Sequence, residues 1–246
     1  MKQLRTPNDP SQASCPSCWK AVSLCVCEVR PHLTSKTQFL ILQHPRETRS
    51  PLGSARLLSL ALPESSVHRV GLSWRSLDQA FGWGKQDPSE WAVLYLGTQK
   101  DSAPAVDAPA FEVRDRKGKP LPQVRLKGIV LLDGNWKQSK TLWWRNPWLL
   151  KLNRLLLNPA QSSRYGTLRR QPRARCLSTL EAGAESLHAL GENQTSEALF
   201  AYFETFLEKA RTAPREPKRP NRVRGFKPIA PGKPPTLESP PPASVH

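Results

Sequence analysis

Short apolar runs recur along the chain and are separated by polar, turn-forming segments. Three of these runs are about five residues long, which fits strands that are buried on both faces of a parallel sheet. The expected strands are 38–42, 92–96 and 128–132, with a strand-like segment at 154–157. His44, Tyr95 and Asp133 lie at or near the carboxyl ends of the first three, where open α/β sheets bind their ligands.

Between these runs, apolar residues recur at the three- and four-residue spacing of a helix. Helices are expected over 54–62, 137–144, 179–190 and 195–211, and Pro63 ends the first. Ser178 and Glu181 have the spacing of a capping box. Strands that alternate with helices predict an α/β fold with a mainly parallel sheet flanked by helices.

The charge adds a partner class to this fold. The 246 residues include 37 Lys and Arg against 20 Asp and Glu, a formal net charge of +17. Such an excess favours nucleic acid first and an anionic membrane second. No apolar run approaches the roughly 20 residues that span a bilayer. Residues 1–7 lack the apolar core of a signal peptide, so we expect a cytoplasmic protein.

The C-terminal residues have a different composition. Residues 214–246 hold ten prolines and seven Lys or Arg with few large apolar side chains. Such a segment cannot bury enough apolar surface to offset the entropy of ordering. We expect a disordered basic tail over 212–246, which is either a solvated extension or an electrostatic arm that speeds encounter with RNA.

Four of the five cysteines fall within the first 27 residues, as Cys15, Cys18, Cys25 and Cys27. Two close thiol pairs joined by a short loop can surround a tetrahedral ion, so we expect a structural zinc knuckle over residues 1–34. The alternatives are small unliganded thiols in a flexible terminus or a redox pair. Cys176 stands alone and is interpreted as a packing residue.

The region from Gly134 to Leu180 has no carboxylate, yet it holds ten Lys or Arg, four Trp and a Tyr. Asp133 at its head is a candidate proton acceptor or orienting carboxylate, or else a cap of the following helix. Trp136 could stack on a base or cofactor ring, although a Trp at that place in a helix is more often a core residue.

Residues 162–175 interleave five arginines with Tyr165 and several hydroxyl groups. Guanidinium groups bind phosphates and an aromatic ring stacks on unpaired bases, so the segment suits structured or single-stranded RNA. Because its surroundings hold no carboxylate, we expect nothing nearby to neutralise these charges. The alternative is a solvated basic face. Near the first strand, His44 could be structural, and Arg46 and Glu47 could pair on the surface.

In this order, the motifs resemble the DTW-domain family of tRNA-uridine aminocarboxypropyltransferases. The resemblance covers about residues 15–206 and rests on several ordered motifs. They are the cysteine knuckle, Gln43-His44-Pro45-Arg46-Glu47, Ser54-Ala55-Arg56-Leu57-Leu58, Leu132-Asp133-Gly134-Asn135-Trp136, the segment 163–172, and Leu177-Ser178-Thr179-Leu180-Glu181-Ala182.

The resemblance implies a SPOUT-like, knotted catalytic domain over 35–211. It also implies S-adenosylmethionine as donor and transfer of its 3-amino-3-carboxypropyl group to N3 of a tRNA uridine. Asp133 and Trp136 would then be the catalytic residues. The donor site would be bordered by His44, Glu47, Tyr95, Gly97, Leu132, Ser178, Thr179 and Glu181. The residues facing RNA would be Ser163, Arg164, Tyr165, Arg169, Arg170 and Arg173.

Some positions depart from the family pattern. Asn135 stands where the family commonly has Thr, Ser54 also replaces a commoner Thr, and Leu96-Gly97 replaces the usual Pro after the second strand. Two rival functions remain: an S-adenosylmethionine-dependent RNA methyltransferase of the same fold, and a non-catalytic zinc-ribbon protein that binds RNA. The sequence does not define an oligomeric state.

Overall fold

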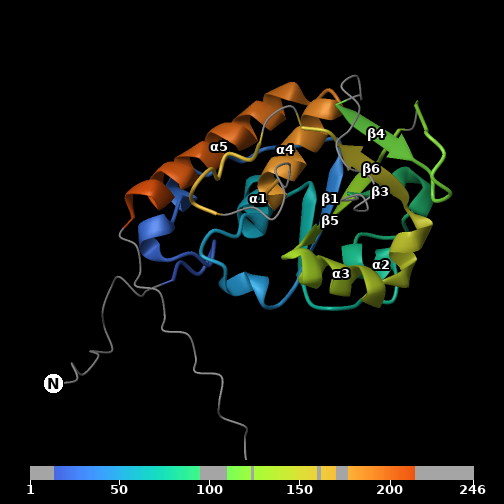
Figure 1. The fold of residues 1–246 in the computed structure, drawn as a ribbon, viewed down its shortest axis with the longest axis horizontal. Helices are drawn as coiled ribbons and strands as arrows, with labels where there is room; N and C mark the ends of the chain where they lie inside the picture. The colour runs from blue at the N-terminus through green and yellow to red at the C-terminus, as the bar shows by residue number, and fades with distance from the viewer. Residues whose placement is uncertain (1–13, 95–109, 123–124, 160–161, 170–176, 214–246) are drawn as a thin grey trace, which may run out of the picture. The chain divides into compact units, whose positions relative to one another are not determined.

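Six strands form one sheet in the computed structural model of this chain. They are β1 (Gln38–Gln43), β2 (Ser66–Val70), β3 (Trp91–Leu94), β4 (Phe111–Arg114), β5 (Gly128–Asp133) and β6 (Asn153–Leu157). Their spatial order is β2-β1-β5-β3-β6-β4 (Figure 1). Every pairing is parallel except that of β4 with β6 at one edge. The predicted mainly parallel sheet is therefore confirmed.

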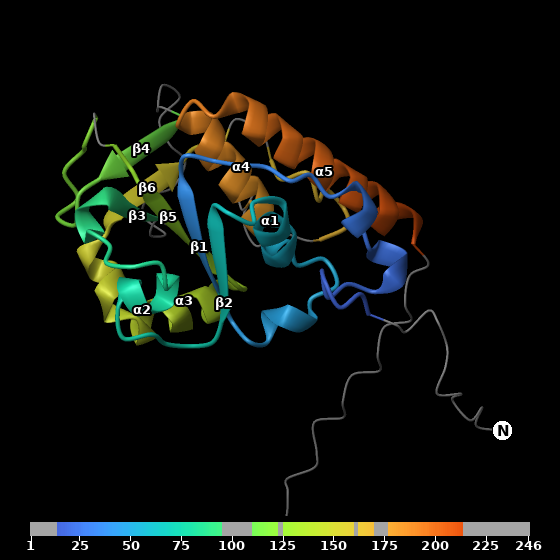
Figure 2. The ribbon, with the colours of Figure 1, turned by 180° about the vertical axis from the view of Figure 1, so that it is seen from behind.

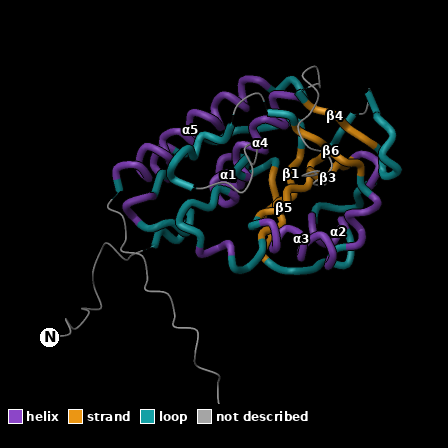
Figure 3. The backbone as a smooth tube through the Cα atoms, viewed as in Figure 1, coloured by secondary structure: helices purple, strands orange, loops and turns teal. Residues whose placement is uncertain are grey.

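The structure describes residues 14–94, 110–122, 125–159, 162–169 and 177–213. Its helices are α1 (Ala55–Ala61), α2 (Leu77–Phe81), α3 (Trp136–Arg145), α4 (Thr179–Ala189) and α5 (Asn193–Thr212). Short 3-10 segments also occur in the described residues (Figure 3), namely η2 (Val22–Leu24), η3 (Cys27–Val29), η4 (Glu47–Arg49), η5 (Pro88–Glu90) and η6 (Pro147–Lys151). Of the tail predicted over 212–246, Thr212 belongs to α5 and residues 214–246 lie outside the described residues.

The helices cover both faces of the sheet. α1, α4 and α5 lie on one face, and α2 and α3 lie on the other (Figures 1 and 2). Alternate residues of β1 point to opposite layers: Phe39 and Ile41 join the α1, α4 and α5 core, whereas Leu40 and Leu42 join the core beside α2. All four side chains are fully buried. Burial on both faces explains why the strand is a continuous apolar run.

The strands that the sequence did not reveal are the two at the edges of the sheet. β2 has five residues and β4 four, and β4 is the antiparallel edge strand. The five-residue helix α2 was also missed. The expected helices all exist, with ends that differ by one or two residues. None of the helices in the described residues is both long and apolar enough to cross a membrane.

The topology has a switch point at the ends of β1 and β5. These two strands are neighbours, and their last residues, Gln43 and Asp133, are paired in register. The first α-helix after β1 is α1 on one face of the sheet, whereas β5 is followed by α3 on the other (Figure 1). Ligands of open α/β sheets bind where the connections that follow two neighbouring strands lead to opposite faces of the sheet. Asp133 therefore lies at the position expected of a binding site.

Candidate functional site

The carboxylate of Asp133 joins the sheet to α4. Its Oδ2 accepts a hydrogen bond of 2.7 Å from Gln43 Nε2, and its Oδ1 accepts one from the hydroxyl of Thr179, the first residue of α4. The Asp133 side chain is buried. Gln43 Oε1 is also buried and has no hydrogen-bond partner in the part of the chain described. The two bonds fix the orientation of the carboxylate and leave an unsatisfied acceptor beside it.

Asp133 does not cap the helix that follows it. The N-cap of α3 is Asn135, whose Oδ1 accepts from the backbone N–H of Gln138 at 3.1 Å. Gln138 Oε1 in turn accepts from the Asn135 N–H at 2.6 Å, completing a capping box. A β-carbon at Gly134 would stand 2.7 Å from the β-carbon of Gln138, so the turn requires glycine. The cap interpretation of Asp133 is therefore wrong, and Asn135 performs that role.

Glu47 brings a second carboxylate and an arginine to the same edge. Glu47 is buried in η4, four residues beyond the end of β1. Its Oε1 accepts from Arg169 Nη2 at 3.1 Å. The alternative interpretation, a surface pair of Glu47 with Arg46, is therefore wrong. The pair also corrects the expectation that nothing neutralises the basic segment, because the neutralising carboxylate comes from a distant part of the chain.

Glu181 ties the start of the basic segment to α4. Its carboxylate accepts from the Ser163 hydroxyl at 2.7 Å, the Arg164 N–H at 2.6 Å and the Ser178 N–H at 2.8 Å. The Ser178 hydroxyl accepts from the Glu181 N–H at 3.2 Å, so the predicted capping box is confirmed. Glu181 is 1% exposed. The carboxylate therefore serves an internal connection and does not face an open pocket.

The ring of Tyr165 is not available to a base in this arrangement. Tyr165 is 2% exposed, and its hydroxyl donates to the backbone oxygen of Leu52. Its ring packs edge-on against Phe203 of α5 at 5.3 Å between centroids. Burial raises the pKa of Tyr165 to about 12. The expected stacking of Tyr165 on RNA is therefore wrong, and the residue anchors the basic segment to the core.

The other predicted site residues are distributed around this centre. His44 follows β1, and its N–H donates to the Asp133 carbonyl at 3.0 Å. Arg164 lies over the Phe200 ring of α5 at 4.5 Å, away from Asp133 in sequence and in contacts. Leu132 packs on the α2 side of the sheet. Trp136 is 45% exposed, so the interpretation of Trp136 as a core residue is wrong. Four predicted residues lie outside the described ranges: Tyr95, Gly97, Arg170 and Arg173.

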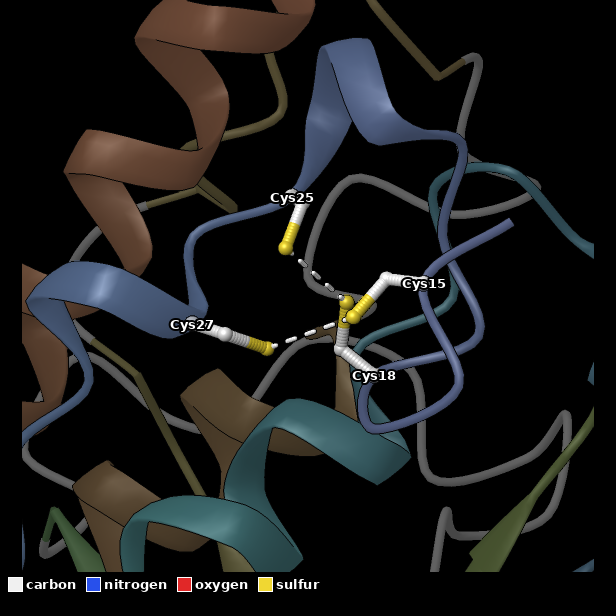
Figure 4. A group of neighbouring side chains, drawn as sticks. All are labelled: Cys15, Cys18, Cys25 and Cys27. Atoms are coloured by element: carbon white, nitrogen blue, oxygen red, sulfur yellow. Dashed lines mark hydrogen bonds between the residues drawn. The ribbon is translucent and has the colours of Figure 1, made fainter. Parts of the chain in front are cut away.

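The four N-terminal cysteines converge on one point. Their sulfur atoms point toward one another (Figure 4) and all lie within 4.8 Å of each other. The Sγ atoms of Cys15 and Cys27 are 3.8 Å apart, and those of Cys18 and Cys25 are 3.7 Å apart. A tetrahedral ion with metal–sulfur bonds of about 2.3 Å requires sulfur separations of about 3.8 Å. The cluster could therefore hold a metal ion.

The cysteine knuckle also places a buried lysine near the site. A turn over Cys15–Lys20, with Trp19 in the left-handed region at φ 61°, directs Lys20 inward. Lys20 is 5% exposed, and its Nζ donates to the Ser50 backbone oxygen at 3.0 Å. Burial lowers its pKa to about 8, against the opposing negative charges of Cys18, Asp133 and Glu47. Nothing in the sequence marked Lys20 among 37 basic residues.

A cavity of about 310 Å³ lies at the outer side of α1, beside the knuckle. Arg56, one of its lining residues, donates to the Ser17 backbone oxygen at 2.9 Å and lies over the Trp19 ring at 4.6 Å. These contacts place the cavity at the junction of knuckle and helix, separate from Asp133. Its lining consists of Arg30, His32, Arg56, Ser59, Leu60 and Pro63.

Comparison with known proteins identifies the family. The family model described as the DTW domain matches residues 12–211. The chain belongs to the DTW domain family. The match begins just before the cysteine knuckle and ends within α5, so it includes the knuckle, Asp133, Glu47 and the Glu181 connection.

Several proteins whose names state an activity resemble the chain. It is 28% identical to tRNA-uridine aminocarboxypropyltransferase 2 of Macaca fascicularis over 76% of this chain and 60% of that protein. It is 31% identical to the protein of the same name from Drosophila melanogaster, over 72% of this chain and 66% of that protein. For tRNA-uridine aminocarboxypropyltransferase A of Arabidopsis thaliana the identity is 27%, over 72% of both.

The chain therefore spans about three-fifths to two-thirds of the length of the first of these relatives. No solved structure matches it significantly.

The connection made by Glu181 predicts a large effect on stability. Glu181→Ala removes three hydrogen bonds to a charged acceptor, two of them buried and one partly buried, and leaves their donors unsatisfied. We expect the free energy of unfolding, measured by urea denaturation, to fall by about 3 kcal/mol. Glu185→Ala, one turn further along α4 and half-buried, is the control and should cost less than about 1 kcal/mol. Equal losses in the two variants would contradict the role of Glu181.

Proposed function

We propose that this chain transfers the 3-amino-3-carboxypropyl group of S-adenosylmethionine to N3 of a tRNA uridine. Membership of the DTW domain family and similarity to proteins named tRNA-uridine aminocarboxypropyltransferase support the reaction. The chain spans only part of the length of the first relatives. The proposal therefore also rests on the arrangement of the chain's own residues.

That evidence is the position of Asp133. A carboxylate that only capped α3 would have no need of Gln43 and Thr179, yet both side chains hold it while Asn135 caps the helix. The burial and orientation of Asp133 at the end of a central strand fit a group that works on a ligand. This observation disfavours a purely RNA-binding protein.

The reaction requires little covalent chemistry from the protein. The uracil N3 attacks the carbon of the 3-amino-3-carboxypropyl group that is bonded to sulfur. An N–C bond forms as this C–S bond breaks, and the positive sulfonium leaves as a neutral thioether. The proton of N3 must leave as well. Asp133 is the group that we assign to accept this proton or to orient the uracil that loses it. The rest of the rate acceleration would come from holding the uracil N3 in line with the carbon that it attacks.

The donor would lie at the ends of β1 and β5. Gln43 Oε1 is buried and has no partner among the residues that the structure describes, so it could accept from an N–H group such as the ammonium of the donor. His44, Glu47, Leu132, Ser178 and Thr179 would border that site, with Tyr95 and Gly97 from the segment after β3.

Arg169 would face the tRNA beside the proposed donor site, with Arg164, Arg170 and Arg173 extending the basic surface. A cytoplasmic location and the SPOUT-like knot belong to the same proposal. The knot stays a prediction, because residues 170–176 between β6 and α4 lie outside the described residues.

We assign zinc to the cysteine cluster. Four sulfur ligands at tetrahedral separations suit a closed structural zinc site, in which no position remains for a substrate. Zinc would hold the knuckle in the conformation that buries Lys20 and presents the Cys25 backbone oxygen to Lys209 of α5, a contact of 2.6 Å.

A double-label experiment tests the reaction. The full chain is incubated with tRNA and donor labelled either on the methyl carbon or on the carboxypropyl carbons. We expect only the carboxypropyl label to enter tRNA, and mass spectrometry of the nucleosides should find it on uridine. Incorporation of the methyl label would instead establish an RNA methyltransferase.

Asp133→Asn tests the assigned carboxylate. Asparagine has nearly the same shape, and Gln43 can turn its amide to keep their hydrogen bond, so the fold and the affinity for tRNA should persist. We expect the rate of transfer to fall by about 100-fold or more, the usual effect of losing an acid–base group. Asp87→Asn, an exposed cap of η5, is the control. Full activity of Asp133→Asn would exclude proton acceptance by this group, because asparagine can still orient the uracil but cannot take up its proton.

The metal assignment predicts about one zinc per chain by elemental analysis. Cys15→Ser or Cys27→Ser should lose the metal and lower the melting temperature, because zinc binding contributes directly to folding. Cys176→Ser, which changes the isolated fifth cysteine, should keep it. A fully folded chain purified without any metal would refute the site.

A further inference from the structure

Helix α3 exposes an unusual row of side chains. Trp136 is 45% exposed and Trp144 is 71% exposed. Lys140 lies midway between them and is exposed too. Residues four apart share one side of a helix, so the three form a continuous row, with Lys137 at its border. Ser139 and Leu142 are buried on the opposite side. We call the row Trp136, Lys140 and Trp144 the α3 face.

The fold alone does not account for this exposure. Large aromatic side chains gain much stability from burial, and this chain buries Trp91 and Trp148 in the same layer as α3. Two large aromatic rings exposed eight residues apart on one helix represent apolar surface that is usually reserved for a binding partner. Because α3 begins next to Asp133, a partner bound to this helix would lie beside the candidate site.

The α3 face is rigidly connected to the candidate site. α3 begins three residues after Asp133, and its first turn is closed by the Asn135 capping box. The Ser139 hydroxyl donates to the Gly134 backbone oxygen at 3.1 Å, which ties the helix to the turn after β5. A ligand on this face would therefore be held in a fixed relation to the Asp133 carboxylate.

The charges identify the kind of partner. The ten residues of α3 include Lys137, Lys140 and Arg145 and no carboxylate. Cations attract a polyanion, and indole rings stack on bases without regard to sequence. A protein partner is less well matched, because the centres of protein interfaces are depleted in lysine and this row has lysine at its centre. RNA satisfies both the charge and the aromatic character.

The spacing distinguishes unpaired nucleotides from a duplex. Eight residues of helix separate Trp136 from Trp144, a distance of about 12 Å along the axis. Neighbouring bases in a duplex are stacked about 3.4 Å apart, which leaves no room for an inserted indole. Bases that are splayed out of the stack can each reach a ring.

We propose that the α3 face binds unpaired nucleotides of an RNA, next to the nucleotide that enters the site at Asp133. The proposal deepens the proposed function and rests on it for the identity of that RNA as tRNA. It explains the two exposed rings, the lysine between them and the absence of acids on the helix with one ligand.

Binding of a short RNA tests the face without depending on catalysis. The probe is a fluorescein-labelled oligouridylate of about eight nucleotides, within the range bound by other single-strand sites. Fluorescence anisotropy with the full chain measures its affinity. We expect Trp144→Ala to weaken binding about 10-fold and Trp144→Phe to restore most of it, because a smaller ring can still stack.

Two further variants separate charge from stacking. Lys140→Met should reduce the slope of log affinity against log salt by about 0.7, the value for one phosphate contact on a single strand. Trp83→Ala removes another exposed Trp from the turn after α2, 47% exposed against 71% for Trp144, and should leave affinity unchanged. An equal loss from Trp83→Ala would overturn the proposal, because any exposed tryptophan would then suffice.

Other outcomes are equally decisive. Unchanged affinity of correctly folded Trp144→Ala would overturn the α3 face, while retained transfer by the wild-type chain would leave the proposed function standing. If Trp144→Ala instead abolished self-association in sedimentation and left RNA affinity intact, the face would be an interface between copies of this chain. A wild-type chain that transfers nothing yet loses oligouridylate affinity with Trp144→Ala would keep the RNA face and refute the transferase.

Discussion

The attachment of Asp133 to both the sheet and α4 is the interaction on which the site depends. Gln43 reaches the carboxylate from the neighbouring strand, and Thr179 reaches it from the first turn of α4. Parallel pairing of β1 with β5 brings Gln43 and Asp133 level, although 90 residues separate them in sequence. The candidate chemistry is thus an outcome of strand register, and a change in that register would remove it.

The cysteine knuckle belongs to the same unit as this sheet. Lys20, Arg56 and Lys209 connect it to the loop before α1, to α1 itself and to α5. Four thiolates around a divalent metal would carry net negative charge, and these three cations lie close enough to balance it. The knuckle therefore stabilises the loop that contains Glu47 more directly than its distance in sequence suggests.

The sequence predicted those elements that bury a long apolar pattern. β1, β5, α4 and α5 were foreseen because continuous runs or helical stripes identify them. β4 was missed because a four-residue edge strand buries little and leaves a weak pattern. The cysteine cluster and the capping box were foreseen because local spacing defines them. Tyr165 was misjudged because its arginine-rich neighbours suggested exposure, whereas its contacts come from Leu52 and α5.

Glu181 completes the α4 capping box and holds Ser163 and Arg164 with the same two oxygens. The first turn of α4 and the start of the basic segment consequently open together. Fraying of either one breaks the hydrogen bonds to Glu181 that also stabilise the other. In native-state hydrogen exchange, the amides of Arg164, Ser178 and Glu181 would then belong to one cooperative unit with a common opening free energy. A basic segment that looks like a surface loop in sequence thereby inherits the rigidity of a helix end.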